Sequence, residues 1–152
     1  MTRPSGLDGR IERLKGGDEG CFGCGAENPI GLGLDDFAPT DDGKVVATFR
    51  PRPDHRGFDG VLHGGIVATA LDETLAWTAM LHEGVPVLTA KLELKYRRPA
   101  PMDEVLSLEG TLLERRGSRL VMSARMTSSE GVVAEAHGLF LVASDTTAGT
   151  GA

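Results

Sequence analysis

Two adjacent acidic residues, Asp72 and Glu73, lie in the middle of an apolar stretch, 66–81, that follows a His-Gly-Gly triplet at 63–65. A helix that is apolar on every side must be buried, and a buried carboxylate is costly unless the surrounding structure supports it. Active sites often contain such carboxylates, because a desolvated carboxylate can act as a general base or as a nucleophile. The helical wheel does not separate the two acids, since both lie among apolar residues. A buried acid that only caps a neighbouring loop is the alternative interpretation.

The glycines Gly64 and Gly65 begin the predicted helix. Glycines at a helix start leave their N–H groups accessible, and the helix dipole adds positive potential at the same place. Such donors suit a carbonyl oxygen that becomes an oxyanion, although an ordinary loop-to-helix turn would also use glycine. His63 either donates to the same substrate carbonyl or merely caps the helix.

The spacing between the glycines and the acids has a geometric consequence. Gly64 and Asp72 are eight residues apart, roughly 12 Å along a helix, so one ester or thioester cannot touch both. If both groups act on one carbonyl, the acid must come from a second, antiparallel helix. We therefore expect a composite site at a twofold dimer interface, with two sites per dimer.

A single α+β domain is predicted to position these groups. The helix should run from about residue 64 to about residue 83, where Gly84 and Pro86 stop it. Alternating apolar residues predict strands at 31–37, 44–49, 87–98, 104–113, 119–127 and 132–143. The last three or four strands should form an antiparallel meander whose apolar face covers the helix.

Length, charge and hydropathy exclude several classes of function. The chain has 152 residues and a net charge of −6, so it lacks the basic patch that nucleic-acid binding requires. The two central acids interrupt the only run that approaches the length of a membrane span, and no N-terminal segment resembles a signal peptide. We expect a cytoplasmic protein without nucleic-acid or membrane partners. Residues 21–144 should form the domain, between flexible segments at 1–20, with a possible short helix around 11–14, and at 145–152.

The only two cysteines form a C-x-x-C pair, Cys21 and Cys24. A full zinc site would need a second pair or histidines at a matching spacing, and the sequence shows neither. A redox pair usually begins a helix after a strand, whereas glycines surround this one. A structural or incidental role is the favoured interpretation, and a partial metal site or a redox role are the alternatives.

Thr89 begins the strand that follows the predicted helix and could hold the water that Asp72 activates. Simple alternation places Thr89 on the polar face with Lys91, so this role requires a β-bulge or an interface position. Arg97 and Arg98 supply positive charge at the end of the same strand. They could bind the phosphates of a nucleotide-like carrier, or serve only as the solvated charges that sheet edges need.

Together these positions resemble the hotdog-fold acyl-CoA thioesterases of the PaaI-like kind. The resemblance rests on the triplet at 63–65, on Asp72 and Thr89, and on Tyr-Arg-Arg-Pro-Ala at 96–100, and it spans roughly residues 31–142. The segments Cys-Phe-Gly-Cys-Gly and Asn-Pro-Ile-Gly-Leu before it also look like one branch of that superfamily. The resemblance implies a long central helix wrapped by a curved antiparallel sheet of five to six strands. It further implies a homodimer formed through the sheet, often paired into a homotetramer.

The resemblance also implies roles for individual residues. Family members use an acid nine residues after the histidine as base or nucleophile, and Asp72 falls at that position. The N–H of Gly64 would stabilise the oxyanion, with Thr89 and His63 assisting. Further substrate contacts are expected from Gly65, Arg56, Glu73, Arg97 and Arg98. Arg56 stands where many relatives carry Asn or Gln as a second polarising donor.

The implied reaction is hydrolysis of an acyl-CoA, or a related acyl thioester, to a free acid and a thiol, without a metal or a cofactor. Hotdog folds also host hydratases and dehydratases that act on enoyl thioesters, which usually need a His facing an acid over the acyl chain. A non-catalytic acyl-CoA-binding protein or regulator is the third possibility. Release of free thiol would distinguish the first function from the other two.

Overall fold

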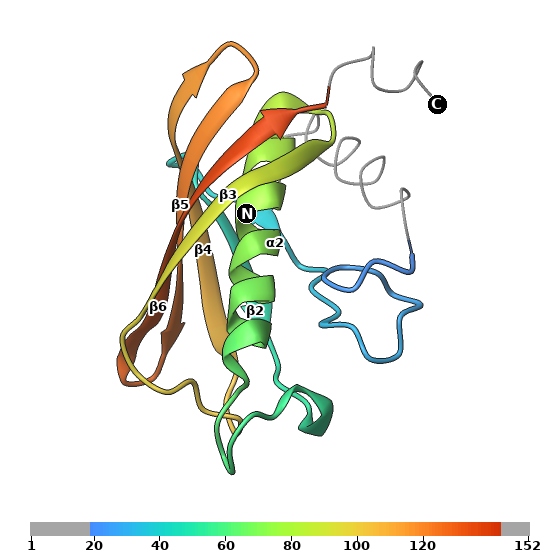
Figure 1. Cartoon of the computed structure of the whole chain (residues 1–152), viewed down its shortest axis with the longest axis vertical. Helices are drawn as coiled ribbons and strands as arrows, with labels where there is room; N and C mark the ends of the chain where they lie inside the picture. Colours follow the sequence, from blue (N-terminus) through green and yellow to red (C-terminus); the bar gives the residue numbers. More distant parts are fainter. Residues whose placement is uncertain (1–18, 144–152) are drawn as a thin grey trace.

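One long helix lies against a six-stranded antiparallel sheet in the computed structural model, which describes residues 19–143 (Figure 1). The helix is α2, Gly64–Glu83, and a short 3-10 helix, η1, Pro53–His55, precedes it. The strands are β1 (Ala38–Pro39), β2 (Val45–Phe49), β3 (Val87–Tyr96), β4 (Leu106–Arg116), β5 (Arg119–Ser128) and β6 (Gly131–Val142). The expectations for a helix around 11–14 and for flexible ends lie outside the described residues, except at positions 19 and 20.

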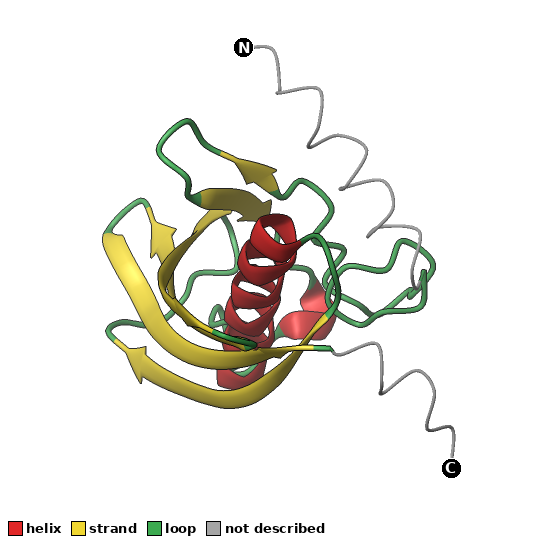
Figure 2. Cartoon of the chain, turned by 90° about the horizontal axis from the view of Figure 1, so that it is seen from above, coloured by secondary structure: helices red, strands yellow, loops and turns green. Residues whose placement is uncertain are grey.

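The sheet curves around α2, as Figure 2 shows from above, and its strand order is β1-β2-β4-β5-β6-β3. Strands β2 to β6 all contact the helix. The core between them consists of alternate strand residues, such as Leu108 and Met122, packed against Leu71, Leu75 and Trp77 of the helix. This arrangement confirms the hotdog fold that the resemblance implies. It also confirms the α+β class that the hydrophobic pattern predicts.

Local sequence sets both ends of α2 where the pattern predicts them. At the start, the side chain of His63 accepts a hydrogen bond from the backbone N–H of Gly65. At the end, Gly84 adopts the left-handed conformation, with φ of 76°, and its N–H donates to the Met80 carbonyl at 2.7 Å. Glycine reaches this conformation without the steric penalty of a Cβ, so it closes the helix.

The predicted strand at 31–37 is wrong. Its leucines are buried, but its backbone pairs with the cysteine-containing loop and not with the sheet: Leu32 N–H donates to the Phe22 carbonyl at 2.8 Å and Leu34 N–H to the Gly23 carbonyl at 3.0 Å. Only β1, two residues long, follows this segment. Alternating burial therefore arose here from packing on the helix, without a sheet partner.

The predicted meander is confirmed for β4, β5 and β6, which are neighbours in sequence and in space. The earlier strand β3 pairs with β6 and forms one edge of the sheet. The chain therefore crosses from one side of the sheet to the other between β3 and β4. Thr89 and its neighbours thus lie at an edge, where a further strand could pair with them.

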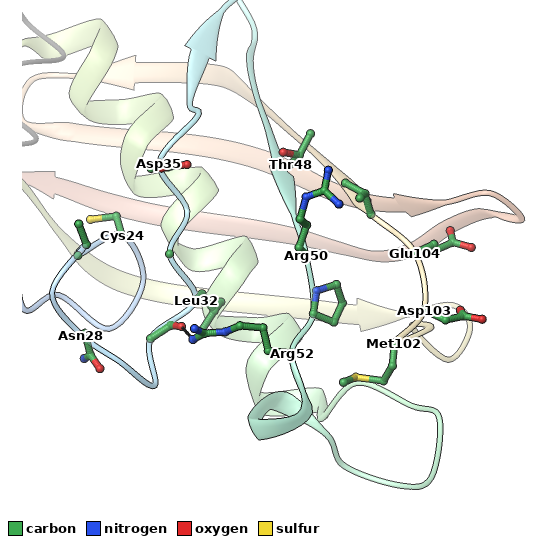
Figure 3. Close-up of a pocket in the computed structure, with 16 residues that line it drawn as sticks. Cys24, Asn28, Leu32, Asp35, Thr48, Arg50, Arg52, Met102, Asp103 and Glu104 are labelled. Carbon is green, nitrogen blue, oxygen red and sulfur yellow. Dashed lines mark hydrogen bonds between the residues drawn. The ribbon is translucent and has the colours of Figure 1, made fainter.

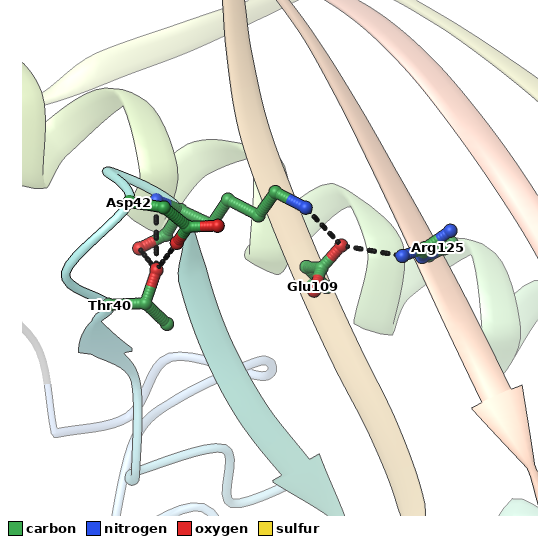
Figure 4. A network of polar contacts seen from close by, with 5 residues as sticks. Thr40, Asp42, Glu109 and Arg125 are labelled. Atoms are coloured by element: carbon green, nitrogen blue, oxygen red, sulfur yellow. Dashed lines mark hydrogen bonds and ion pairs between the residues drawn. The ribbon is translucent and has the colours of Figure 1, made fainter.

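The convex face of the sheet carries charged side chains instead of a second apolar layer. Glu109 on β4 accepts hydrogen bonds from Lys44 at 3.4 Å and from Arg125 on β5 at 2.9 Å (Figure 4). The Thr40 hydroxyl donates to Asp42 in the adjoining turn. Exposed ion pairs of this kind contribute little stability, so the concave face on α2 supplies most of the packing energy.

Strand β4 approaches the helix closely at Gly110. A Cβ at this position would overlap the hydroxyl of Thr78, which donates to the Thr74 carbonyl at 2.6 Å. Replacing Gly110 by alanine should therefore lower the free energy of unfolding by about 1–3 kcal/mol. The added methyl group would overpack the core, so that β4 or α2 must move to accommodate it. Urea denaturation of the wild type and the variant measures this difference.

The matched test removes the overlapping hydroxyl. In a double-mutant cycle, Thr78→Ala should offset part of the cost of Gly110→Ala, since the two changes act on one contact. Strictly additive costs would contradict this explanation of the glycine.

Candidate functional site

The first turn of α2 presents one free backbone donor. The Nδ1 atom of His63 accepts from the Gly65 N–H at 2.9 Å, so His63 caps the helix and the Gly65 donor is already used. Within residues 19–143, no hydrogen bond uses the N–H of Gly64. Because Nδ1 of His63 acts as acceptor, the neutral ring carries its proton on Nε2. Gly64, and not Gly65, is thus the donor available at the helix start.

A cavity of about 710 Å³ opens at this end of the helix. Its lining comes from the loop before α2, from the first turn, and from the end of β3, and includes Phe58, His63, Gly64, Tyr96, Arg97 and Arg98. The Tyr96 hydroxyl donates to the Gly64 carbonyl at 2.6 Å. This bond holds the end of β3 against the helix start, so the two arginines that follow β3 and the free donor share one cavity.

The two arginines are partly engaged by neighbours. Arg97 forms an ion pair with Glu135 at 2.8 Å, and one guanidinium nitrogen of Arg98 donates to the Glu130 carbonyl at 2.6 Å. Both therefore have fixed positions but keep further donors for a ligand. Arg56, expected to contact substrate, is exposed and is not part of the cavity lining.

Asp72 lies in the middle of α2 and faces β3. The hydroxyl of Thr89 donates to Asp72 Oδ1 at 2.9 Å. Burial raises the pKa of the Asp72 carboxyl, while the bond from Thr89 lowers it. A carboxylate held at a raised pKa beside a hydroxyl is suited to accept a proton.

A β-bulge explains why Thr89 can reach Asp72. The pairing of β3 with β6 shifts register between Thr89 and Lys91, so the side chains on either side of Ala90 do not follow simple alternation. Simple alternation would leave Thr89 on the polar face, so its approach to Asp72 requires such a bulge or an interface position. The structure contains the bulge and the contact.

Glu73 has a different environment from its neighbour. The thiol of Cys21 lies 3.9 Å from Glu73 Oε1, and burial, followed by the nearby charge of Asp72, raises the pKa of the Glu73 carboxyl. Burial and the Glu73 charge also raise the pKa of the Cys24 thiol to about 12. Glu73 therefore faces the cysteine loop and lies outside the lining of the cavity at the helix start. The expected contact between Glu73 and substrate has no support from this geometry.

A second cavity, of about 840 Å³, lies between the cysteine loop, the end of β2 and the segment before β4 (Figure 3). Arg50, Arg52 and Glu104 line it, and the Arg52 guanidinium donates to the Gly31 carbonyl. Neither Asp72 nor Gly64 belongs to this lining. Although it is larger, this cavity does not contain the groups suited to acyl transfer.

No individual role could be predicted from the sequence for two residues that line the cavity at the start of α2. Tyr96 fixes Gly64, and Phe58 is 85% exposed on the rim of the cavity. Tyr96 belongs to the segment at 96–100 on which the resemblance rests. Phe58 is an isolated aromatic residue in a Gly-rich loop, and the sequence pattern does not distinguish it from the other phenylalanines. Across residues 19–143, no helix has the length and apolar character needed to cross a membrane.

Comparison with protein families gives one match that covers the candidate site. A model described as the thioesterase superfamily matches residues 59–135. Acyl-coenzyme A thioesterase THEM4 of Bos taurus is 31% identical over 122 residues, which are 79% of this chain and 50% of that protein. Acyl-coenzyme A thioesterase THEM5 of Homo sapiens is 32% identical over 107 residues, which are 69% of this chain and 42% of that protein. The chain thus spans about half the length of the curated relatives it matches.

Solved structures agree with this assignment of the fold. The crystal structure of a thioesterase superfamily protein superposes with a TM-score of 0.63 at 31% identity, covering 69% of this chain and 54% of that one. A hypothetical thioesterase protein from Streptococcus pneumoniae TIGR4, solved with coenzyme A, superposes with a TM-score of 0.64 at 24% identity. That alignment covers 70% of this chain and 86% of the other.

Proposed function

Because the chain belongs to the thioesterase superfamily, we propose that it hydrolyses an acyl thioester, most readily an acyl-CoA, to a free acid and a thiol. The observation that carries the proposal is the contact of Thr89 with the half-buried Asp72, a carboxyl whose pKa burial raises. The names of the relatives THEM4 and THEM5 support the acyl-CoA class of substrate. Coenzyme A bound to the Streptococcus pneumoniae protein supports the same class.

In the proposed reaction, Asp72 acts as general base. The Thr89 hydroxyl donates to the carboxylate and keeps lone pairs with which to accept a hydrogen bond from water. This water loses its proton to Asp72 and attacks the thioester carbonyl, whose oxygen becomes an oxyanion. When the tetrahedral intermediate collapses, the carbon–sulfur bond breaks and the leaving thiolate takes the proton back. Direct attack by the Asp72 carboxylate is the alternative route.

The free N–H of Gly64 is the proposed oxyanion donor. It lies at the positive end of the helix dipole, and it faces the developing charge without having to break another hydrogen bond. Arg97 and Arg98 line the same cavity and would contact the phosphates of the carrier. The His63 ring, fixed by its cap, could present Nε2–H to the same carbonyl.

Two copies of the chain are required by this proposal. Eight residues separate Gly64 from Asp72, roughly 12 Å along α2, which is too far for one carbonyl carbon. Edge strand β3 carries exposed apolar side chains, Leu88 at 60% and Tyr96 at 53%. Antiparallel pairing of two β3 edges would bring Asp72 of one copy towards Gly64 of the other. A homodimer, alone or paired into a tetramer, follows from the proposal.

Replacing Thr89 by valine should move the acidic limb of the pH–rate profile to higher pH. The Thr89 bond lowers the pKa of Asp72, so its loss raises that pKa further, and a base works only when deprotonated. Activity should therefore disappear at a higher pH as the solution is acidified. The measurement is kcat/KM against pH for the wild type, Thr89→Val and Thr89→Ser.

Thr89→Ser is the matched control, because it keeps the hydroxyl and should keep the profile of the wild type. If the acidic limbs of the valine and serine variants coincide, the Thr89 hydroxyl does not affect the pKa of Asp72.

The general test is a panel of acyl-CoA substrates with thiol release as the readout. Release of free CoA from at least one acyl class is the expected result. Tight acyl-CoA binding without thiol release would indicate a binding protein instead. Loss of the double bond of an enoyl-CoA, without thiol release, would indicate a hydratase.

A further inference from the structure

The two cysteines and Glu73 form a compact group of potential metal ligands. The Sγ atoms of Cys21 and Cys24 and a carboxylate oxygen of Glu73 all lie within 4.8 Å of one another. Tetrahedral zinc, with Zn–S of about 2.3 Å and Zn–O of about 2.0–2.2 Å, separates its ligand atoms by roughly 3.5–3.8 Å. Movements of about 1 Å or less would bring the three atoms to that spacing.

The cysteine loop is held tightly against α2. A Cβ at Gly23 would overlap the Glu73 side chain, and a Cβ at Gly25 would overlap the backbone of Cys21. The Gly25 N–H donates to the Cys21 carbonyl at 2.9 Å, which closes a turn between the cysteines. Two further backbone bonds, described above for the 31–37 segment, tie the middle of the loop to the following chain. The loop therefore presents both thiols to one point on the helix.

A buried donor without a partner lies on the same face of α2 as Glu73, because residues four positions apart share a helix face. Trp77, one helical turn after Glu73, is 1% exposed, and in the described part of the chain its Nε1–H donates to no atom. Thiolates and carboxylates that bind a metal usually accept hydrogen bonds from donors around the site. A protonated thiol does not require such a hydrogen bond.

We propose that Cys21, Cys24 and Glu73 bind one zinc ion, with water as the fourth ligand, and so attach the cysteine loop to α2. Two thiolates favour zinc over magnesium or calcium, which prefer oxygen ligands. On binding, both thiols lose their protons to water and two Zn–S bonds form, so no oxidant is involved. The site does not depend on the hydrolysis proposed for Asp72, since Glu73 lies against the cysteine loop whereas Thr89 contacts Asp72.

Only two of the three ligands are apparent from the sequence, because Glu73 is 52 residues from Cys21 in the chain. No spacing rule for zinc sites connects a C-x-x-C pair to a helical acid in a different element. The fold supplies this ligand.

The test measures zinc and cobalt binding by the full chain after reduction and removal of metal. Elemental analysis should give one zinc per chain after dialysis, and Co²⁺ should produce the intense thiolate-to-cobalt absorption of a tetrahedral thiolate site. Glu73→Gln, which preserves shape, should weaken zinc binding at least about tenfold. Cys24→Ser should abolish the thiolate absorption. Glu27→Gln, an exposed carboxylate of the same loop, should bind zinc as the wild type does.

A thermal readout keeps the test independent of catalysis. Zinc should raise the melting temperature of the wild type and of Glu27→Gln, and should raise that of Glu73→Gln less, because only the folded state offers the site. Absence of stoichiometric zinc in the reduced wild type would overturn the proposal. Equal zinc affinity of Glu73→Gln and the wild type would overturn it also. A Cys21–Cys24 disulfide whose reduced form binds no zinc would assign the pair to redox chemistry instead.

Discussion

Replacement of Asp72 by asparagine should lower the turnover number for acyl-thioester hydrolysis at least about a hundredfold, the scale of losing a general base. Asparagine keeps the size of the side chain and can still accept the hydrogen bond from Thr89. It cannot take a proton from water at neutral pH, so the effect should fall on kcat. Steady-state kinetics on the best acyl-CoA of the panel measures it.

Asp41→Asn is the control for this variant, because Asp41 is an exposed carboxylate in the turn before β2 and lies outside the site. It should leave kcat unchanged. If Asp72→Asn hydrolyses several acyl-CoAs as fast as the wild type, Asp72 is neither base nor nucleophile.

Replacement of Gly64 by proline should lower kcat about 10²–10³-fold, the usual cost of removing one oxyanion donor. Proline removes the N–H in question, and the first position of a helix tolerates its ring well. His63, with φ of −60° and ψ of 134°, already has the extended conformation that a residue before proline adopts. The helix should therefore form as before, and circular dichroism with urea denaturation checks that it does.

Gly64→Ala supplies the matched control, since it adds a side chain but keeps the N–H. The nearest atom to its Cβ would be the Tyr96 hydroxyl at 3.7 Å, an ordinary contact. Alanine should retain most of the activity that proline removes. Equal losses in the two variants would attribute the effect to bulk in the cavity and not to the missing donor.

The helix and most strands could be predicted because their signals are local. Glycines and a proline mark the ends of α2, and period-two alternation marks β4 and β5. The failure at 31–37 has a physical cause: a buried, alternating segment looks like a strand whether its backbone pairs with a sheet or with a loop. In this chain the cysteine loop took the place of the missing strand partner.

The roles of the two adjacent acids could not be derived from periodicity. Asp72 meets Thr89 only because a bulge follows Thr89, and Glu73 meets Cys21 only because a loop from the start of the domain packs on the helix. The first contact depends on an irregularity of strand pairing that period-two alternation does not show, and the second joins residues 52 positions apart in the chain. The resemblance indicated Asp72 together with Thr89, and these two side chains form a hydrogen bond, whereas the helical wheel left the choice between the acids open.

The most direct test of a site shared by two chains is subunit complementation. Asp72→Asn and Gly64→Pro chains carrying different tags are co-expressed, and the heterodimer is purified through both tags. If Asp72 of one copy works with Gly64 of the other, each heterodimer has one intact site, and turnover should return to about half that of the wild type. A heterodimer no more active than the two parent variants would show that the groups do not act across an interface.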